Sequence, residues 1–244
     1  MLLYVIRHGE PDYADDSLTP AGKLQAEALG KKLGKVSWSH IYSSPLGRAR
    51  KTAEPLAWRA GLQIEQETWT SEALVWNEFR RDSSGLEEPN LWASNIANYK
   101  FHTPENRRKG DDWQSCDCLQ NLGSHFTPET GCARLKKQSD EFLKKLGYER
   151  FGGQYRIQQA HEENIALFCH SGFCSCWFPY LLDIPHHLFW SCFSPLSHTG
   201  VVMVYFQNFS AGWTCPRILC WNDLSHLYAD GLKQPYLQTP GRVH

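Results

Sequence analysis

The sequence predicts an α/β fold built around a mostly parallel sheet. Short apolar runs alternate along the chain with segments of helical periodicity, which is typical of βαβ units. Some of these runs are apolar at nearly every position, as strands are when both faces of a sheet are covered. The chain has 244 residues, 41% of them hydrophobic, which is long enough to enclose one large core.

Six short runs are the strand candidates. From residue 164 to 216 the only formally charged side chain is Asp183, so this stretch is expected to supply central strands and the helices that cover them. The six candidates are residues 2–6, 40–42, 62–65, 165–169, 201–206 and 217–221.

The first helix is predicted from its two ends. Thr19 followed by Pro20 is an N-cap residue followed by a proline in the first helical position. Leucines and alanines follow at helical spacing, and Gly34 stops the pattern. We therefore expect a helix from Pro20 to the residue before Gly34.

Three further helices follow from similar signals. Ser44-Pro45 repeats the start signal ahead of a helix over 48–58, which Pro55 should kink or end. Thr127-Pro128 opens a helix that runs to about residue 146. A fourth helix is expected over 172–182.

Residues 80–124 follow no strong period and are rich in Asn, Ser, Gly and charge. A long aperiodic stretch inside a compact domain is typical of a functional lid or of disorder. Trp92, Tyr99 and Trp113 favour a lid that packs on something. We expect residues 1–244 to form one domain with a lid-like insertion at about 80–124.

Charge and cysteine content exclude several classes of protein. The 25 basic and 26 acidic side chains give a net charge of -1, which argues against a nucleic-acid-binding face. The nine cysteines are odd in number, and no signal peptide is recognisable, so we expect a cytoplasmic protein with free thiols. Residues 165–182 carry no Asp, Glu, Lys or Arg, but His170 and Pro179 interrupt them, which favours a buried strand, a turn and a helix over a membrane span.

Cationic and imidazole side chains recur where predicted strands end. Arg7 and His8 follow the first strand, and His170 follows the strand over 165–169. Arg48 lies in the first turn of the helix after the strand over 40–42. Ligands bind at the carboxyl ends of strands in such sheets, so we expect these four side chains to share one site.

Phosphate is the ligand that fits this set of residues. Two guanidinium groups match the geometry of phosphate oxygens, and helix N-termini at Ser44-Pro45 and Gly172 add N–H donors. A neutral His8 offers a ring nitrogen that can attack phosphorus, and His170 can bind the oxygens being transferred.

At this point the chain resembles the histidine phosphatase superfamily, the branch that also contains cofactor-dependent phosphoglycerate mutases. The matching motifs span almost the whole chain in the family's order. They are R-H-G-E at 7–10, L-T-P-A-G at 18–22, S-S-P-L-G-R-A-R-K-T-A at 43–53, H-S-G at 170–172 and N-D-L-S-H-L at 222–227.

The resemblance implies a fold and a mechanism. The fold would be a three-layer α/β/α sandwich with an inserted lid. His8 would attack the phosphate in line and become phosphohistidine, while Arg7, Arg48 and His170 clamp the phosphoryl oxygens. A carboxylic acid would protonate the leaving oxygen and then activate water.

The resemblance places this acid after the third strand and before the insertion. Glu72, Glu78, Glu87 and Glu88 are the candidates there. Trp76-Asn77-Glu78-Phe79 is most similar to the family's pattern of an aromatic residue, a glutamate and a second aromatic residue. Apolar neighbours raise the pKa of a carboxyl group, so we assign the acid to Glu78 over Glu72.

The remaining site residues are assigned more broadly. Glu10 and Tyr13 either line the site or order its loop, and Ser171 and Gly172 are expected to contact substrate phosphate. The C-x-C pairs at 116–118 and 174–176 lack zinc-site spacing, so no metal and no cofactor are expected.

Three functions remain as alternatives. The first is a hydrolase of small phosphomonoesters, the second a mutase that returns the phosphoryl group to its substrate, and the third an inactive binding protein on the same scaffold. Asp12, Asp15 and Asp16 would repel a substrate with several acidic groups, which favours hydrolysis of a neutral or cationic phosphomonoester. No nucleic-acid or membrane partner is expected, and a homodimer is left open.

Overall fold

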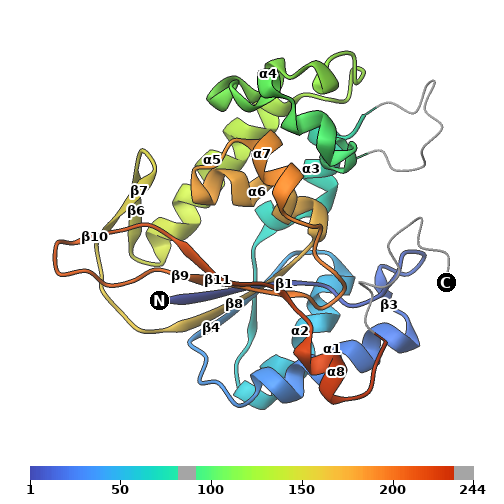
Figure 1. Ribbon diagram of the computed structural model, residues 1–244. Helices are drawn as coiled ribbons and strands as arrows, with labels where there is room; N and C mark the ends of the chain where they lie inside the picture. Colours follow the sequence, from blue (N-terminus) through green and yellow to red (C-terminus); the bar gives the residue numbers. More distant parts are fainter. Residues whose placement is uncertain (82–91, 234–244) are drawn as a thin grey trace. The chain divides into compact units, whose positions relative to one another are not determined.

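The computed structural model describes residues 1–81 and 92–233 (Figure 1). It divides into two compact units. The first comprises residues 1–71, 160–171 and the chain from 196 onward, and the second comprises residues 72–159 and 172–195.

The first unit contains a six-stranded sheet. Strands β1, β8, β4 and β5 run parallel, while β9 is antiparallel to both of its neighbours, β1 and β11. The mostly parallel sheet predicted from the sequence is thus confirmed. The strands in sheet order are β11 (Arg217–Asp223), β9 (Val201–Tyr205), β1 (Leu2–Arg7), β8 (Asn164–Cys169), β4 (His40–Ser43) and β5 (Ile64–Gln66).

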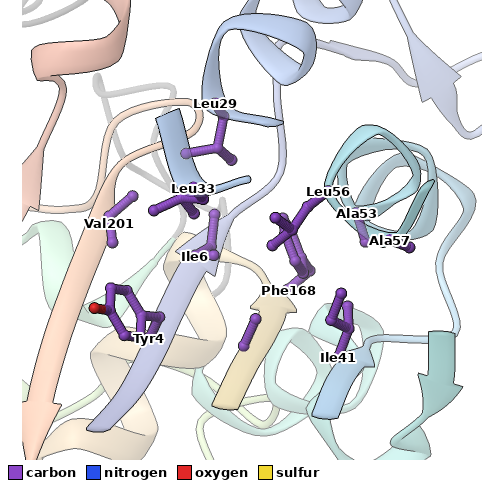
Figure 2. Close-up of a cluster of buried hydrophobic side chains, with 11 residues drawn as sticks. Tyr4, Ile6, Leu29, Leu33, Ile41, Ala53, Leu56, Ala57, Phe168 and Val201 are labelled. Atoms are coloured by element: carbon purple, nitrogen blue, oxygen red, sulfur yellow. The ribbon is translucent and has the colours of Figure 1, made fainter. Parts of the chain in front are cut away.

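Helices α1 (Pro20–Leu33), α2 (Gly47–Ala60) and α8 (Ser225–Ala229) lie together on one face of this sheet (Figure 1). Figure 2 shows side chains of α1 and α2 meeting strand residues in one apolar core. Leu29 and Leu56 are fully buried there against Ile6 and Phe168. Burial of each such side chain stabilises the fold by about 1.5–3 kcal/mol. This core therefore holds the strands in place.

Both ends of α1 agree with the prediction. The Thr19 hydroxyl accepts the N–H of Gly22 at 3.0 Å, Pro20 takes the first helical position, and Gly34 is the C-cap. This cap satisfies one of the N–H groups that a helix leaves unpaired at its start.

Helix α2 agrees closely with the helix predicted over 48–58. It begins at Gly47, one residue before the predicted start, and its first N–H is bound at 2.6 Å by a carboxylate oxygen of Asp16. It also continues beyond Pro55 to Ala60. Pro55 packs closely on α1, since a Cβ added to Gly30 would lie 2.8 Å from the Pro55 Cβ. Packing of this kind offsets the hydrogen bond that a proline removes from a helix.

The second unit is mainly helical. Its elements are α3 (Glu72–Phe79), α5 (Pro128–Lys145), α6 (Ser171–Leu182, in this unit from Gly172), α7 (His186–Cys192) and a hairpin of β6 (Tyr148–Phe151) and β7 (Gln154–Ile157). The apolar stretch 165–182 is a buried strand followed by a helix, as predicted. Across residues 1–81 and 92–233, no helix combines the length and apolar character needed to cross a membrane.

The described part of the insertion consists of short helical turns. They are η2 (Ala93–Asn95), η3 (Asn98–His102), α4 (Pro104–Arg107), η4 (Gly110–Ser115) and η5 (Asp117–Leu119). Trp113 is buried and stacks on His186 with 4.4 Å between ring centroids, and Trp92 meets Trp76 at 4.9 Å. Tyr99, the third aromatic residue of the insertion, is 70% exposed. Glu87 and Glu88 lie outside the described residues.

The described residues also include four short elements. They are β2 (Pro11–Asp12), β3 (Ser17–Leu18), η1 (Thr68–Thr70) and β10 (Trp213–Thr214). β2 and β3 pair as a two-stranded hairpin, which holds the loop between Gly9 and Thr19.

Candidate active site

Register places the predicted histidines side by side. Arg7, the last residue of β1, lies opposite Cys169, the last residue of β8. The next residues are His8 and His170, and the His8 N–H donates to the Cys169 carbonyl at 3.0 Å. The two imidazole centroids are 5.1 Å apart. The sequence argument from strand ends is thus supported for these two residues.

His8 is fixed in one tautomer. Its ring is fully buried, and Nδ1 lies 2.7 Å from the carbonyl oxygen of Gly9. A carbonyl only accepts, so Nδ1 carries the proton and Nε2 carries the lone pair. Nε2 is buried and makes no hydrogen bond with any described residue. Burial, then the charges of Arg7 and Arg48, hold the pKa of His8 well below its ordinary value of 6.5, so the ring is neutral and nucleophilic.

His170 is equally buried and is held by a neighbouring strand. Its Nε2 lies 2.7 Å from the hydroxyl of Ser44, the residue that follows β4. Burial first, and then the nearby His8, Arg48 and Arg7, place the pKa of His170 well below 6.5. A neutral imidazole here can exchange hydrogen bonds with a bound anion without adding a charge.

The guanidinium groups of Arg7 and Arg48 supply the positive charge of the site. Arg7 donates through Nη1 to the carbonyl of Leu196, which anchors it. Arg48, in the first turn of α2, donates through Nη1 to Oδ1 of Asp16 at 2.7 Å. Both charges act on the rings of His8 and His170, which shows that the four predicted residues form one cluster within the first unit.

A third histidine, His198, was not predicted. Its ring centroid is 5.8 Å from that of His8, and burial together with the charge of Arg7 lowers its pKa to about 3. His198 precedes β9 rather than following a strand. Because β9 runs antiparallel, its amino end lies beside the carboxyl end of β1, with Val201 opposite Ile6. The place of His198 beside His8 follows only from the antiparallel direction of β9. The sequence pattern does not reveal this direction.

Glu10 and Tyr13 differ in their roles. A carboxylate oxygen of Glu10 accepts the hydroxyl of Thr19 at 2.8 Å, so Glu10 orders the loop at the start of α1. The ring of Tyr13 is 68% exposed and lies below the guanidinium of Arg48, whose Cζ is 5.4 Å from the ring centroid. Tyr13 therefore remains a candidate for contact with a ligand at Arg48.

In the second unit, Glu78 and Glu72 have different partners. Nε and Nη2 of Arg134 donate to the two carboxylate oxygens of Glu78 at 2.7 and 2.5 Å. The apolar setting that the sequence argument gave Glu78 is therefore not observed. Glu72, the first residue of α3, accepts the N–H of Gly172 at 3.1 Å through Oε1.

Ser171 and Gly172 form the start of α6. Ser171 follows His170 directly and is its first helical residue. A Cβ at Gly172 would lie 2.4 Å from the ring of Trp92 and 3.0 Å from Oε1 of Glu72. The peptide N–H of Gly172 is engaged by Glu72, so the predicted contact of Gly172 with substrate remains a prediction.

The chain is similar to known proteins in sequence. Residues 3–105 match the family described as histidine phosphatase superfamily (branch 1). The probable phosphoglycerate mutase GpmB of Salmonella choleraesuis (strain SC-B67) is 32% identical over 106 residues. The match covers 39% of this chain and 49% of that protein, so the chain spans about half the length of this relative.

Solved structures share the fold over most of their length. Phosphoserine phosphatase of Entamoeba histolytica has a TM-score of 0.56 at 20% identity, covering 93% of this chain and 98% of that chain. A mycobacterial glucosyl-3-phosphoglycerate phosphatase with inorganic phosphate has a TM-score of 0.58 at 22% identity, covering 92% and 98%. These similarities concern the fold alone.

Proposed function

We propose that this chain is a member of the histidine phosphatase superfamily and hydrolyses small phosphomonoesters through a phosphohistidine at His8. The observation that carries the proposal is the buried Nε2 lone pair of His8, which makes no hydrogen bond with any described residue and lies among two guanidinium groups and a second neutral imidazole. The two guanidinium groups beside this nucleophile favour an anionic substrate, and phosphate fits both of them.

In the first half-reaction, Nε2 of His8 forms a bond to phosphorus while the bond between phosphorus and the ester oxygen breaks. Arg7, Arg48 and His170 stabilise the negative charge on the three remaining oxygens. The Gly9 carbonyl keeps the proton on Nδ1, so the positive charge that develops on the ring is stabilised from that side.

The leaving oxygen takes a proton from a carboxylic acid, and we assign this role to Glu72. Its carboxylate binds the N–H of Gly172, which is separated from His170 by Ser171 alone. Glu78, the residue favoured from the sequence, is engaged at both oxygens by Arg134 and serves the packing of α3 on α5. In the second half-reaction the same carboxylate takes a proton from water, which attacks phosphorus and releases phosphate and neutral His8.

The two glutamates can be separated by experiment. Glu72→Gln is expected to lower kcat roughly 10²- to 10⁴-fold for substrates with poor leaving groups, and less for p-nitrophenyl phosphate, whose leaving group needs no proton. Glu78→Gln serves as the matched variant and is expected to change stability more than kcat. The reverse pattern would return the acid to Glu78.

The nucleophile is tested with a panel of phosphomonoesters, using the wild type and His8→Ala. Phosphate release by the wild type that persists in EDTA, and is lost in His8→Ala, is expected. A denaturing alkaline quench during turnover should leave phosphate on the wild type that later acid treatment removes, and none on His8→Ala. Loss of turnover in EDTA would contradict the metal-free mechanism, and labile phosphate on His8→Ala would exclude His8 as the nucleophile.

A mutase is the second candidate, because the curated relatives are named probable phosphoglycerate mutases. Isomerisation of a phosphoglycerate without net release of phosphate would favour it. The acidic loop supports hydrolysis through Asp12 and Asp15, while the charge of Asp16 is paired with Arg48. A cytoplasmic location is part of the proposal, supported by nine cysteines that are all free thiols.

A further inference from the structure

The loop that carries His198 is built onto the active-site strands. The Thr199 N–H donates to the carbonyl of His8 at 3.1 Å, and the Gly200 carbonyl accepts the N–H of Arg7 at 3.1 Å. Oδ1 of Asn222 accepts the N–H of Ser197 at 2.9 Å. Main-chain contacts of Thr199 and Gly200 therefore fix the position of His198 relative to the nucleophile, and the side chain of Asn222 holds Ser197 on the other side.

Thr199 holds a backbone conformation that β-branched residues rarely adopt. Its φ is 57°, in the left-handed region. Its hydroxyl donates to the carbonyl of His198 at 2.7 Å and accepts from Nε2 of His226 at 2.9 Å. Strained residues persist where surrounding contacts over-determine them, and they concentrate at functional sites. The strained residue directly follows His198, whose ring centroid is 5.8 Å from that of His8.

The ring of His198 differs from the other two imidazoles in the cluster. His8 and His170 are fully buried, whereas His198 is only partly buried. Neither ring nitrogen of His198 makes a hydrogen bond with any of the described residues. The ring is neutral above about pH 3 because burial and the charge of Arg7 disfavour its protonation. It offers one N–H donor and one nitrogen acceptor, without charge, beside the nucleophile.

We propose that His198 is a specificity-determining residue that hydrogen-bonds a hydroxyl group of the substrate next to the phosphoester. This inference rests on the proposed function. The phosphoryl group belongs with the fully buried rings and the guanidinium groups, so the part of the substrate that extends outward meets the more exposed ring. A neutral ring with one donor and one acceptor matches a hydroxyl better than a carboxylate or an ammonium group. The substrate class is therefore a phosphorylated polyol or sugar.

The test compares glycerol 1-phosphate with propyl phosphate, which lacks the hydroxyl groups. The wild type is expected to prefer glycerol 1-phosphate in kcat/KM. His198→Phe keeps a ring but removes both nitrogens, and should reduce this preference roughly five- to tenfold, the effect of one hydrogen bond. His198→Gln keeps a donor and should retain part of it. His40→Phe, at the amino end of β4, is the matched control and should leave the preference unchanged.

Equal losses for both substrates in His198→Phe would assign His198 a structural role and overturn the proposal, as would an unchanged preference. Thermal unfolding of each variant identifies a folding defect. Calorimetric binding of both esters to His8→Ala and to His8→Ala/His198→Phe gives a second readout that needs no turnover. If the wild type releases no phosphate from any ester, the proposed hydrolysis fails, whereas this binding comparison still decides the role of His198.

Discussion

The Asp16 carboxylate binds Arg48 through one oxygen, at 2.7 Å, and the N–H of Gly47 through the other, at 2.6 Å. One side chain thus holds a guanidinium of the active site and closes the start of the helix that carries it. Hydrogen bonds from these groups place the pKa of Asp16 below its ordinary value, although burial opposes the shift. The anionic form of Asp16 is therefore the one that supports the site.

Asp16→Ala should lower the free energy of unfolding by about 1 kcal/mol, as the loss of a helix cap does. The ion pair adds little to this figure because the Asp16 side chain is 42% exposed. Urea denaturation measures the change. Asp15→Ala, at the exposed neighbouring position, is the control and should stay within about 0.5 kcal/mol of the wild type. Equal effects at the two positions would show that the cap contributes nothing.

Ser44→Ala should lower kcat/KM for phosphomonoesters by roughly five- to tenfold, since it removes the hydrogen bond that orients His170. The loss should fall mainly on kcat, because His170 acts on the charge that develops in the transition state. Steady-state kinetics separate the two constants. Ser37→Ala, an exposed serine of the same unit, provides the comparison. A change confined to KM would show that Ser44 acts only in ground-state binding.

The sheet could be predicted because its strands are short apolar runs, and buried strands are the one assignment that fits such runs. The runs at 2–6, 165–169 and 201–206 became β1, β8 and β9 with small shifts at their ends. His8 and His170 were predictable for the same reason, since each directly follows such a run.

Other features depend on pairings that no local pattern contains. His198 became visible only through the antiparallel direction of β9. The cap of α2 could not be predicted because its carboxylate, Asp16, is 31 positions from Gly47 in the sequence. The environment of Glu78 was misjudged because Arg134 lies 56 positions away.

Arg134→Met should lower the free energy of unfolding by about 3 kcal/mol, because it leaves the Glu78 carboxylate largely buried without its guanidinium partner. The double variant Glu78→Gln/Arg134→Met should recover part of this loss, since no unpaired charge then remains. Arg50→Met breaks an exposed pair with Glu54, which is 3.9 Å long, and should cost less than about 0.5 kcal/mol. Urea unfolding of the wild type, Glu78→Gln, Arg134→Met and the double variant measures the coupling, and full additivity would contradict it.

Stability should fall as the pH is lowered from about 6.5. Burial lowers the pKa of His186 and of His198 to about 3, and that of His226 to about 4, from an ordinary value of 6.5. Between these values and 6.5 the unfolded chain binds protons that the folded chain does not, so acid favours unfolding. The stabilisation that comes from keeping these histidines neutral is complete above pH 6.5. Below that pH the free energy of unfolding falls by about 1.4 kcal/mol per pH unit for each histidine.

His186→Phe isolates one of these contributions. The ring of His186 stacks on Trp113 and Phe79, so phenylalanine preserves the packing while removing the titrating group. Urea unfolding from pH 7.5 to 4.5 should give this variant a slope of stability against pH that is smaller by about 1.4 kcal/mol per unit. At pH 7.5 the variant and the wild type should differ least in slope, because the histidine is neutral in both the folded and the unfolded state. An unchanged slope at acid pH would mean that His186 takes up its proton in the folded protein.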